Sequence, residues 1–261
     1  MTEEKKLTFL ESIYADDVIG AWVANGLLGK YYQVDANTGL IIRSPGFQAF
    51  WDLPWIMVNN DGTRECDFYK QVEAIYGFIP PPCMECWKVV VFPKTLKQLM
   101  QVLQIEMRMT DANPYCFCKC GIEMRPDVER NYGGYFYTSG INEGLIRLTQ
   151  VREELKKVFG ENSEVKAILK RACTEYERAH GPSDKWDELV TDKHRGIWKK
   201  LNEVFALTKK HTRQPEIIKK HVLTLWLNHA ISIGDPSIKE FNDGKNFYPG
   251  YVLYDIEEAK K

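Results

Sequence analysis

Residues 83–92 read CMECWKVVVF, a cysteine pair followed directly by aromatic and β-branched residues. Because such residues favour extended backbone in a sheet, this stretch predicts a strand over residues 87–92. Three prolines at positions 80–82 come immediately before it. Proline fixes φ and has no amide hydrogen, so these prolines predict extended polyproline II backbone and the boundary of a structural unit.

The segments after this strand alternate between helical and extended patterns. Apolar residues recur at helical spacing over residues 95–107 and 140–159. Residues 115–120 alternate between cysteines and other residues, and residues 132–137 are rich in aromatic side chains. Both patterns are typical of strands. The order strand, helix, strand, strand, helix predicts an α+β fold with a central split-βαβ, ferredoxin-like unit, whose final strand is not evident from the pattern.

Helical patterns lie on both sides of this unit. Before it, we expect helices to start at Thr8 and Ser44. We also expect a hairpin over residues 31–42 and a helix over residues 67–76. After it, three helices are predicted, at residues 164–179, 186–210 and 215–233. We therefore divide the chain into three parts: a mostly helical part with a short hairpin (1–80), a cysteine-bearing α/β unit (81–162) and a helical, locally basic part (163–261).

The composition is that of an ordinary globular protein. Of the 261 residues, 44% are hydrophobic and 27% are charged, and the formal net charge is -1. A charge so close to zero creates no overall field that favours nucleic acid or an anionic membrane. The N-terminus shows no apolar segment typical of a secretory signal, and no run of about 18 apolar residues predicts a membrane span. We therefore expect a cytoplasmic protein without a membrane partner.

Five of the seven cysteines form two tight groups, Cys83 with Cys86, and Cys116 with Cys118 and Cys120. In the reducing cytosol, clustered cysteines bind metals more often than they form structural disulfides. Two short groups can supply four thiolates to one ion. The sequence therefore predicts a Zn²⁺ site made of Cys83, Cys86, Cys118 and Cys120, with Cys116 as a substitute ligand. The function expected from it is that of a metal-binding accessory or binding protein with an unidentified protein partner.

The spacing of the second cysteine group leaves other chemistry open. Alternate side chains of a flat strand lie about 7 Å apart, which is too far for three sulfurs on one ion unless the strand bends. A 4Fe–4S cluster is larger and also takes four thiolates, so an iron–sulfur redox protein, subunit or maturation factor is the alternative. A third interpretation has no metal and treats the alternating cysteines as buried core residues.

Two single cysteines and one further motif have plainer interpretations. Cys66 and Cys173 are isolated in the sequence and are predicted to be core residues. Cys83-x2-Cys86 is followed by a strand, whereas a thiol–disulfide pair usually opens a helix that lowers a thiol pKa. The sequence therefore does not favour a redox-exchange motif.

Residues 193–221 form a basic segment with interleaved tryptophan and histidine. Such a segment can bind phosphates, which makes a nucleic-acid-associated protein a further alternative. The neutral overall charge does not favour it. No spacing of cysteines and histidines indicates a catalytic pair, so the sequence leaves open whether the protein is an enzyme.

Overall fold

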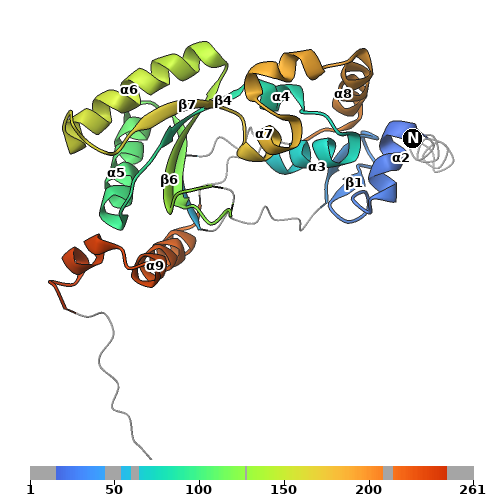
Figure 1. Cartoon of the computed structure of the whole chain (residues 1–261). Helices are drawn as coiled ribbons and strands as arrows, with labels where there is room; N and C mark the ends of the chain where they lie inside the picture. The colour runs from blue at the N-terminus through green and yellow to red at the C-terminus, as the bar shows by residue number, and fades with distance from the viewer. Residues whose placement is uncertain (1–15, 45–53, 60–64, 127, 208–213, 246–261) are drawn as a thin grey trace, which may run out of the picture.

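The computed structural model describes residues 16–44, 54–59, 65–126, 128–207 and 214–245. Its centre is a five-stranded sheet in the order β3-β5-β6-β4-β7, and each neighbouring pair is antiparallel. A separate two-stranded sheet pairs β1 with β2. The fold is therefore mixed α/β with antiparallel sheets (Figure 1). The strands are β1 (Tyr32–Val34), β2 (Ile41–Arg43), β3 (Trp55–Asn59), β4 (Cys86–Val91), β5 (Phe117–Ile122), β6 (Tyr132–Ser139) and β7 (Ala167–Arg171).

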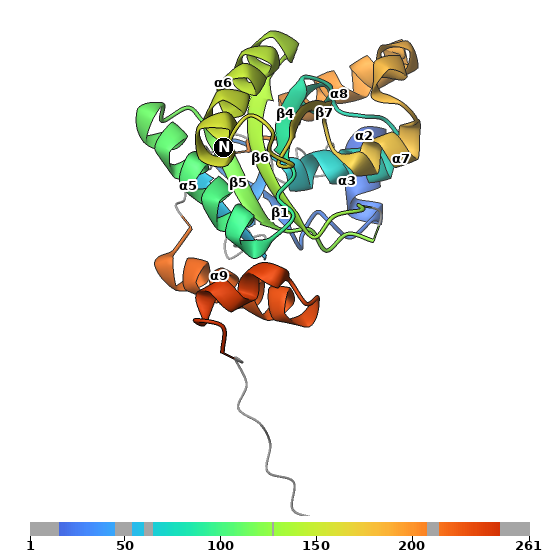
Figure 2. The ribbon, with the colours of Figure 1, turned by 60° about the vertical axis from the view of Figure 1, so that its left-hand side comes forward.

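Two long helices, α5 (Leu96–Ala112) and α6 (Ile141–Phe159), cover one face of the central sheet (Figures 1 and 2). In chain order the unit runs β4, α5, β5, β6, α6, β7. Since both β4 and β5 pair antiparallel with β6, they are parallel to each other and β6 separates them. Likewise β6 and β7 are parallel, with β4 between them. We call the side covered by these helices the helix face and the other side the opposite face.

Local sequence explains why these elements form. Thr95 begins α5, and its side chain accepts a hydrogen bond from the Gln98 amide, as an N-cap does. The apolar stripe of α5 is buried against the sheet together with Val89 and Val91 of β4. These elements confirm the predictions for residues 87–92, 95–107, 115–120, 132–137 and 140–159 to within a few residues.

Two predictions of local structure are wrong. The segment predicted as one helix at residues 164–179 is instead β7 followed by α7 (Thr174–His180), because pairing with β4 buries Ala167 and completes the sheet. The prolines do not remain extended, since only Pro80 does so and α4 (Pro81–Met84) starts directly after it. Proline is tolerated in the first helical turn, where its missing amide hydrogen would have no partner.

A second core joins segments from the two ends of the chain. It contains α2 (Asp17–Ala24), the β1–β2 hairpin, α3 (Cys66–Tyr76) and α8 (Asp192–Val204). Its centre is Trp22, whose ring lies 5.2 Å from that of Phe68 and 4.7 Å from that of Phe205. The hairpin and the helix at residues 67–76 are thereby confirmed, whereas Thr8 and the helix expected after Ser44, from residue 45 onward, lie outside the described residues. All three predicted parts of the chain contribute to the two cores.

The remaining helices complete the molecule. The 3-10 helix η1 (Ser183–Leu189) precedes α8, so the helix predicted over residues 186–210 is two elements. Helix α9 (Glu216–Ser232) confirms the prediction at residues 215–233 and is followed by η2 (Pro236–Phe241). These two lie beyond one end of the sheet (Figure 2), where Trp226 donates to the Pro54 carbonyl and Tyr132 donates to Asp235. No helix in the described part of the chain has the length and apolarity needed to cross a membrane.

Candidate functional site

The two predicted cysteine groups point to opposite faces of the central sheet. The Cα partner of Cys86 on β6 is Ser139, and that of Cys118 is Phe136. Directly paired residues point to the same face, and successive residues of a strand alternate between faces. Positions 136 and 139 differ by an odd number, so Cys86 and Cys118 face away from each other. The structure therefore does not bring Cys83 and Cys86 together with Cys118 and Cys120.

Cys83 and Cys86 instead lie near the two cysteines that were predicted to be isolated core residues. Cys66 is the first residue of α3 and is exposed, so the core prediction is wrong for it, whereas Cys173 precedes α7, is half-buried and packs against the small core that contains Trp186. Burial raises the pKa of the Cys83 thiol, and the neighbouring sulfurs of Cys66, Cys173 and Cys86 raise it further. We call Cys66, Cys83, Cys86 and Cys173 the four-thiol group.

The backbone at the end of β7 places Cys173 in this group. Ala172 is fully buried and has φ of 46°, a left-handed conformation that few residues other than glycine adopt. Its amide donates to the Cys86 carbonyl at 2.7 Å. The chain therefore turns sharply after β7, which sets Cys173 beside the start of β4. Strain of this kind costs about 1–3 kcal/mol and is found mainly at functional sites.

Contacts made by α4 and α7 also hold the four-thiol group in place. Cys83 is on α4 and its sulfur lies 3.5 Å from the Tyr176 hydroxyl of α7. Cys83, Ala172 and Tyr176 belong to one small core with Trp186. Four elements, α3, α4, β4 and the β7–α7 turn, thus each contribute one cysteine at the end of the sheet where β4 begins.

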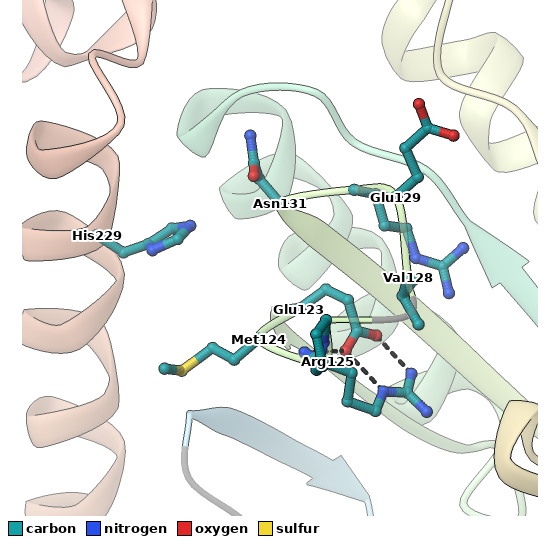
Figure 3. A pocket seen from close by; sticks show the side chains of 9 residues that line it. Glu123, Met124, Arg125, Val128, Glu129, Asn131 and His229 are labelled. Atoms are coloured by element: carbon teal, nitrogen blue, oxygen red, sulfur yellow. Dashed lines mark hydrogen bonds and ion pairs between the residues drawn. The ribbon is translucent and has the colours of Figure 1, made fainter.

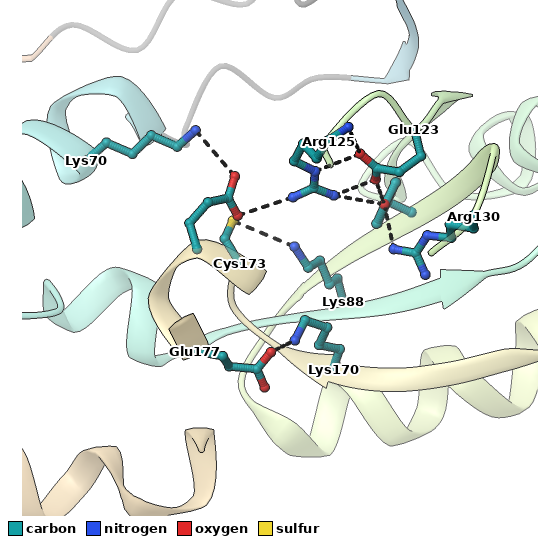
Figure 4. A network of polar contacts seen from close by, with 10 residues as sticks. Lys70, Lys88, Glu123, Arg125, Arg130, Lys170, Cys173 and Glu177 are labelled. Carbon is teal, nitrogen blue, oxygen red and sulfur yellow. Dashed lines mark hydrogen bonds and ion pairs between the residues drawn. The ribbon is translucent and has the colours of Figure 1, made fainter. Parts of the chain in front are cut away.

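A buried ammonium lies against this group. Lys88 is 4% exposed, and its Nζ donates to the Cys173 sulfur at 3.6 Å (Figure 4). Its direct cross-strand neighbour is Lys170, which forms an ion pair with Glu177. The Glu175 carboxylate lies close enough for the charge of Lys88 to help lower the pKa of Glu175. Two lysines directly opposite destabilise a sheet and a buried ammonium needs nearby polar or charged partners, which Glu175 and the Cys173 sulfur supply.

The other cysteines lie in the core under α5 and α6. Cys116, Cys118 and Cys120 are at most 1% exposed. Glu106 of α5 is fully buried beside them, and neither of its carboxylate oxygens has a hydrogen-bond partner among the described residues. The Cys120 thiol lies next to this carboxyl group. Burial raises the pKa of Glu106 well above its usual range, so the group is held protonated.

Neither thiol group already surrounds an ion position. Within the ranges that the structure describes, no three side chains of histidine, cysteine, aspartate or glutamate are arranged to hold a metal ion. The four-thiol group therefore contains suitable donor atoms, but in this structure they are not arranged around one ion position. Sequence reasoning missed Cys66 and Cys173 because they are far apart in the chain. Cys66 directly precedes the helical pattern at residues 67–76, whereas Cys173 lies inside the segment that the sequence predicted as one helix, at residues 164–179.

An open pocket of about 660 Å³ lies between the β5–β6 connection and α9 (Figure 3). Two arginines line it: Arg125 is neutralised by Glu123, whose carboxylate it contacts through two nitrogens, and by Glu175, whereas Arg130 donates to the Tyr135 hydroxyl. His229 lines the other side, and burial lowers its pKa. The charged side chains of the lining are two glutamates and two arginines, whose formal charges balance.

The basic segment at residues 193–221 does not form one surface. Its described residues are divided between α8 and α9, which lie at different ends of the molecule (Figure 1). Arg195, Lys200 and Lys219 each pair with a carboxylate. Lys209, Lys210 and Arg213 lie outside the described residues. The described part thus lacks the continuous basic patch that phosphate binding requires.

Comparisons with models of known protein families, with curated proteins and with solved structures find no match for this chain.

Proposed function

We propose that the protein binds a metal through the four-thiol group, with zinc preferred, and that it acts as a metal-stabilised accessory or binding protein. The observation that carries the proposal is the convergence of cysteines from four separate elements beside the buried Lys88. Four thiolates form the donor set of structural zinc sites. The ligands of the earlier prediction are thereby replaced in part: Cys83 and Cys86 are kept, and Cys66 and Cys173 take the place of Cys118 and Cys120.

The charges in this region support thiolate ligands. A divalent ion with four thiolates carries a net charge of -2, which is costly in a partly buried site unless nearby cations and hydrogen bonds offset it. Lys88 supplies one cation in contact with Cys173, and Lys170 lies opposite it on β7. A bound metal would link α3, α4, β4 and α7, and its binding free energy would contribute to folding.

A 4Fe–4S cluster in the same group is the alternative. A cluster takes four thiolates but is larger than one ion, and the four sulfurs are not arranged around one ion position. In that case the protein would be an iron–sulfur redox protein, subunit or maturation factor. Nucleic-acid binding has no comparable support, because the basic segment is divided.

We also assign residues 86–171 to a ferredoxin-like unit. The assignment is supported by the chain order β4, α5, β5, β6, α6, β7 and by the strand order β5-β6-β4-β7. It concerns architecture only, since one fold serves many functions.

Elemental analysis of protein purified without oxygen tests the proposal. We expect about one equivalent of zinc in colourless protein, or brown protein with absorbance near about 400 nm if a cluster is bound. Cys66→Ala and Cys173→Ala should each lower the metal content, whereas Cys120→Ala, a cysteine on the helix face, should not. Cys66 is exposed, so its replacement leaves the cores unchanged. Equal metal content in all three variants and the unmodified protein, or no metal in any of them, would overturn the proposal.

A further inference from the structure

The two outer edges of the central sheet differ in what covers them. At the β3 edge, the buried Gln214 side chain accepts from the Met57 amide at 2.9 Å and donates to the Trp55 carbonyl at 3.0 Å. It bonds the main chain as a neighbouring strand would. At the other edge, β7 pairs with β4 and, among the described residues, with no further strand. The described part of the sheet is therefore open on the β7 side.

The backbone groups of β7 point alternately toward β4 and toward this open side. The Lys166 carbonyl accepts the Phe92 amide at 3.0 Å on the β4 side. The next carbonyl, that of Ala167, instead accepts a hydrogen bond at 3.1 Å from the Arg152 side chain of α6. Because backbone groups alternate along a strand, Leu169 also turns its N–H and C=O outward. An edge of this kind is a template for an added strand.

Apolar side chains are exposed on both sides of this edge. Ile168 of β7 is paired with Val90 on the opposite face and is 44% exposed. On the helix face, α6 lies beside β7 (Figure 1), and Leu145 of α6 is 50% exposed. Leu145 is seven residues before Arg152 and therefore on the side of α6 that reaches the edge. Edge strands are usually protected by charged side chains, so apolar side chains on both faces favour a bound partner.

Two cations at the edge lack a carboxylate of their own. Arg152 and Lys166 are exposed, and within the described ranges neither forms an ion pair. Arg152 donates to the neutral Ala167 carbonyl. Lys166 is two residues from Glu164, whose carboxylate pairs with Lys94 at 2.7 Å. The charge of the edge is therefore complementary to acidic side chains.

We propose that the β7 edge binds an extended peptide of a partner protein as a further strand of the central sheet. Main-chain hydrogen bonds to Leu169 give affinity, and the flanking side chains give specificity, as in other sites of strand addition. Consecutive side chains of the added strand face opposite sides of the sheet. Leu145 and Ile168 therefore select two consecutive apolar residues. Arg152 and Lys166 select two consecutive acidic residues next to them.

The charges favour such a peptide over a second copy of this chain. A two-fold pairing centred on Leu169 would place Ala167 of each copy opposite Arg171 of the other, so basic side chains would meet across the interface. Like charges placed together in an interface are unfavourable. The peptide site rests on the proposed function, since it names the class of partner of a binding protein. It shares no residue with the four-thiol group, so failure of the peptide site and failure of the metal site are distinguishable.

The test is fluorescence anisotropy of a labelled peptide, acetyl-Ser-Thr-Val-Ile-Glu-Glu-Thr-Ser-amide, titrated with the full-length protein. We expect saturable binding that weakens with added salt, and slower hydrogen exchange of the Leu169 amide in the complex. The same peptide with N-methylated valine and isoleucine keeps its side chains but loses two backbone donors. It should not bind, because strand addition depends on main-chain hydrogen bonds.

Matched variants of the protein test the side-chain contacts. Ile168→Lys should weaken peptide binding, whereas Ile217→Lys, the same change at an exposed position of α9, should not. Lys166→Glu should weaken binding by about 5-fold, the upper range for an exposed ion pair. Lys199→Glu makes the same charge change at an exposed position of α8 and should leave the affinity unchanged.

Several outcomes would overturn the proposal. They are equal binding of the plain and N-methylated peptides, equal affinities of Ile168→Lys and Ile217→Lys, or no binding at millimolar concentration. A dimer that Ile168→Lys dissociates would assign the edge to a second copy. Peptide binding only after removal of residues 246–261 would assign it to this chain's own C-terminal segment, and either result would overturn a partner peptide. The N-methylated peptide requires no variant protein, so the test remains decisive even if a variant does not fold.

Discussion

The two faces of the central sheet each combine cysteines with a buried cation, but they do so by different means. On the opposite face, the four-thiol group is assembled from four elements, and Lys88 contacts Cys173. On the helix face, Cys116 and Cys118 are two residues apart, and Arg147 lies beside them. One group thus depends on long-range packing, whereas the other comes from one short stretch of the chain. The difference teaches that clustering in the sequence does not identify which cysteines share a site.

The largest expected effect is metal removal from the four-thiol group. A chelator should lower the urea midpoint of the metal-loaded protein substantially, because binding free energy of structural zinc is folding free energy. Cys173→Ala should already have the lower midpoint and should not respond to the chelator. Cys120→Ala should respond as the unmodified protein does. A chelator response in Cys173→Ala would show that the metal is held elsewhere.

Substitutions at two adjacent glycines of β6 test how tightly each face of the sheet is packed. A Cβ at Gly134, on the helix face, would lie 2.6 Å from Val102 Cγ1, whereas one at Gly133 would lie 3.0 Å from the Tyr135 ring. Overpacking of a core costs about 1–3 kcal/mol, so Gly134→Ala should be destabilised by about that amount and Gly133→Ala by less. Urea denaturation of both variants measures the difference. The reverse order would mean that the opposite face is the more tightly packed.

Lys88 should have opposite effects with and without metal. Lys88→Met removes a buried charge, so the metal-free protein should become more stable. Its metal affinity should fall by about 10–100-fold, as expected when an outer contact to a ligand is lost. Lys88→Arg retains the charge and serves as the control. Competition with a zinc indicator measures the affinity, and an unchanged value in Lys88→Met would separate Lys88 from the site.

The last prediction concerns Glu106 and depends on pH. Burial raises its pKa in the folded protein, so the folded state holds a proton that the unfolded chain loses above about pH 4.3. The stability that this proton contributes is complete below that pH and falls by up to about 1.4 kcal/mol per pH unit above it. Glu106→Gln should lose this slope. Urea denaturation at pH 5 and pH 8 compares the two proteins, and parallel profiles would contradict a protonated Glu106.

Much of the local structure could be predicted from the sequence. β-Branched residues identified β4, and apolar spacing with the Thr95 cap identified α5. The failures occurred where long-range pairing outweighed local preference. The segment of β7 has the composition of a helix, yet it is a strand because β4 offers it a partner that buries Ala167. Pattern analysis of a single segment cannot detect such a partner.

From the sequence alone it follows that cysteines are concentrated near residue 83 and near residue 118, and that strands begin beside both groups. Which thiols meet depends instead on how the strands pair. The register of β4 and β5 against β6 turns Cys86 and Cys118 to opposite faces, because side chains alternate along a strand. The left-handed turn at Ala172 then brings Cys173 to Cys86. Strand register and the path of the chain after β7 are properties of the whole sheet, so no short stretch of sequence contains them.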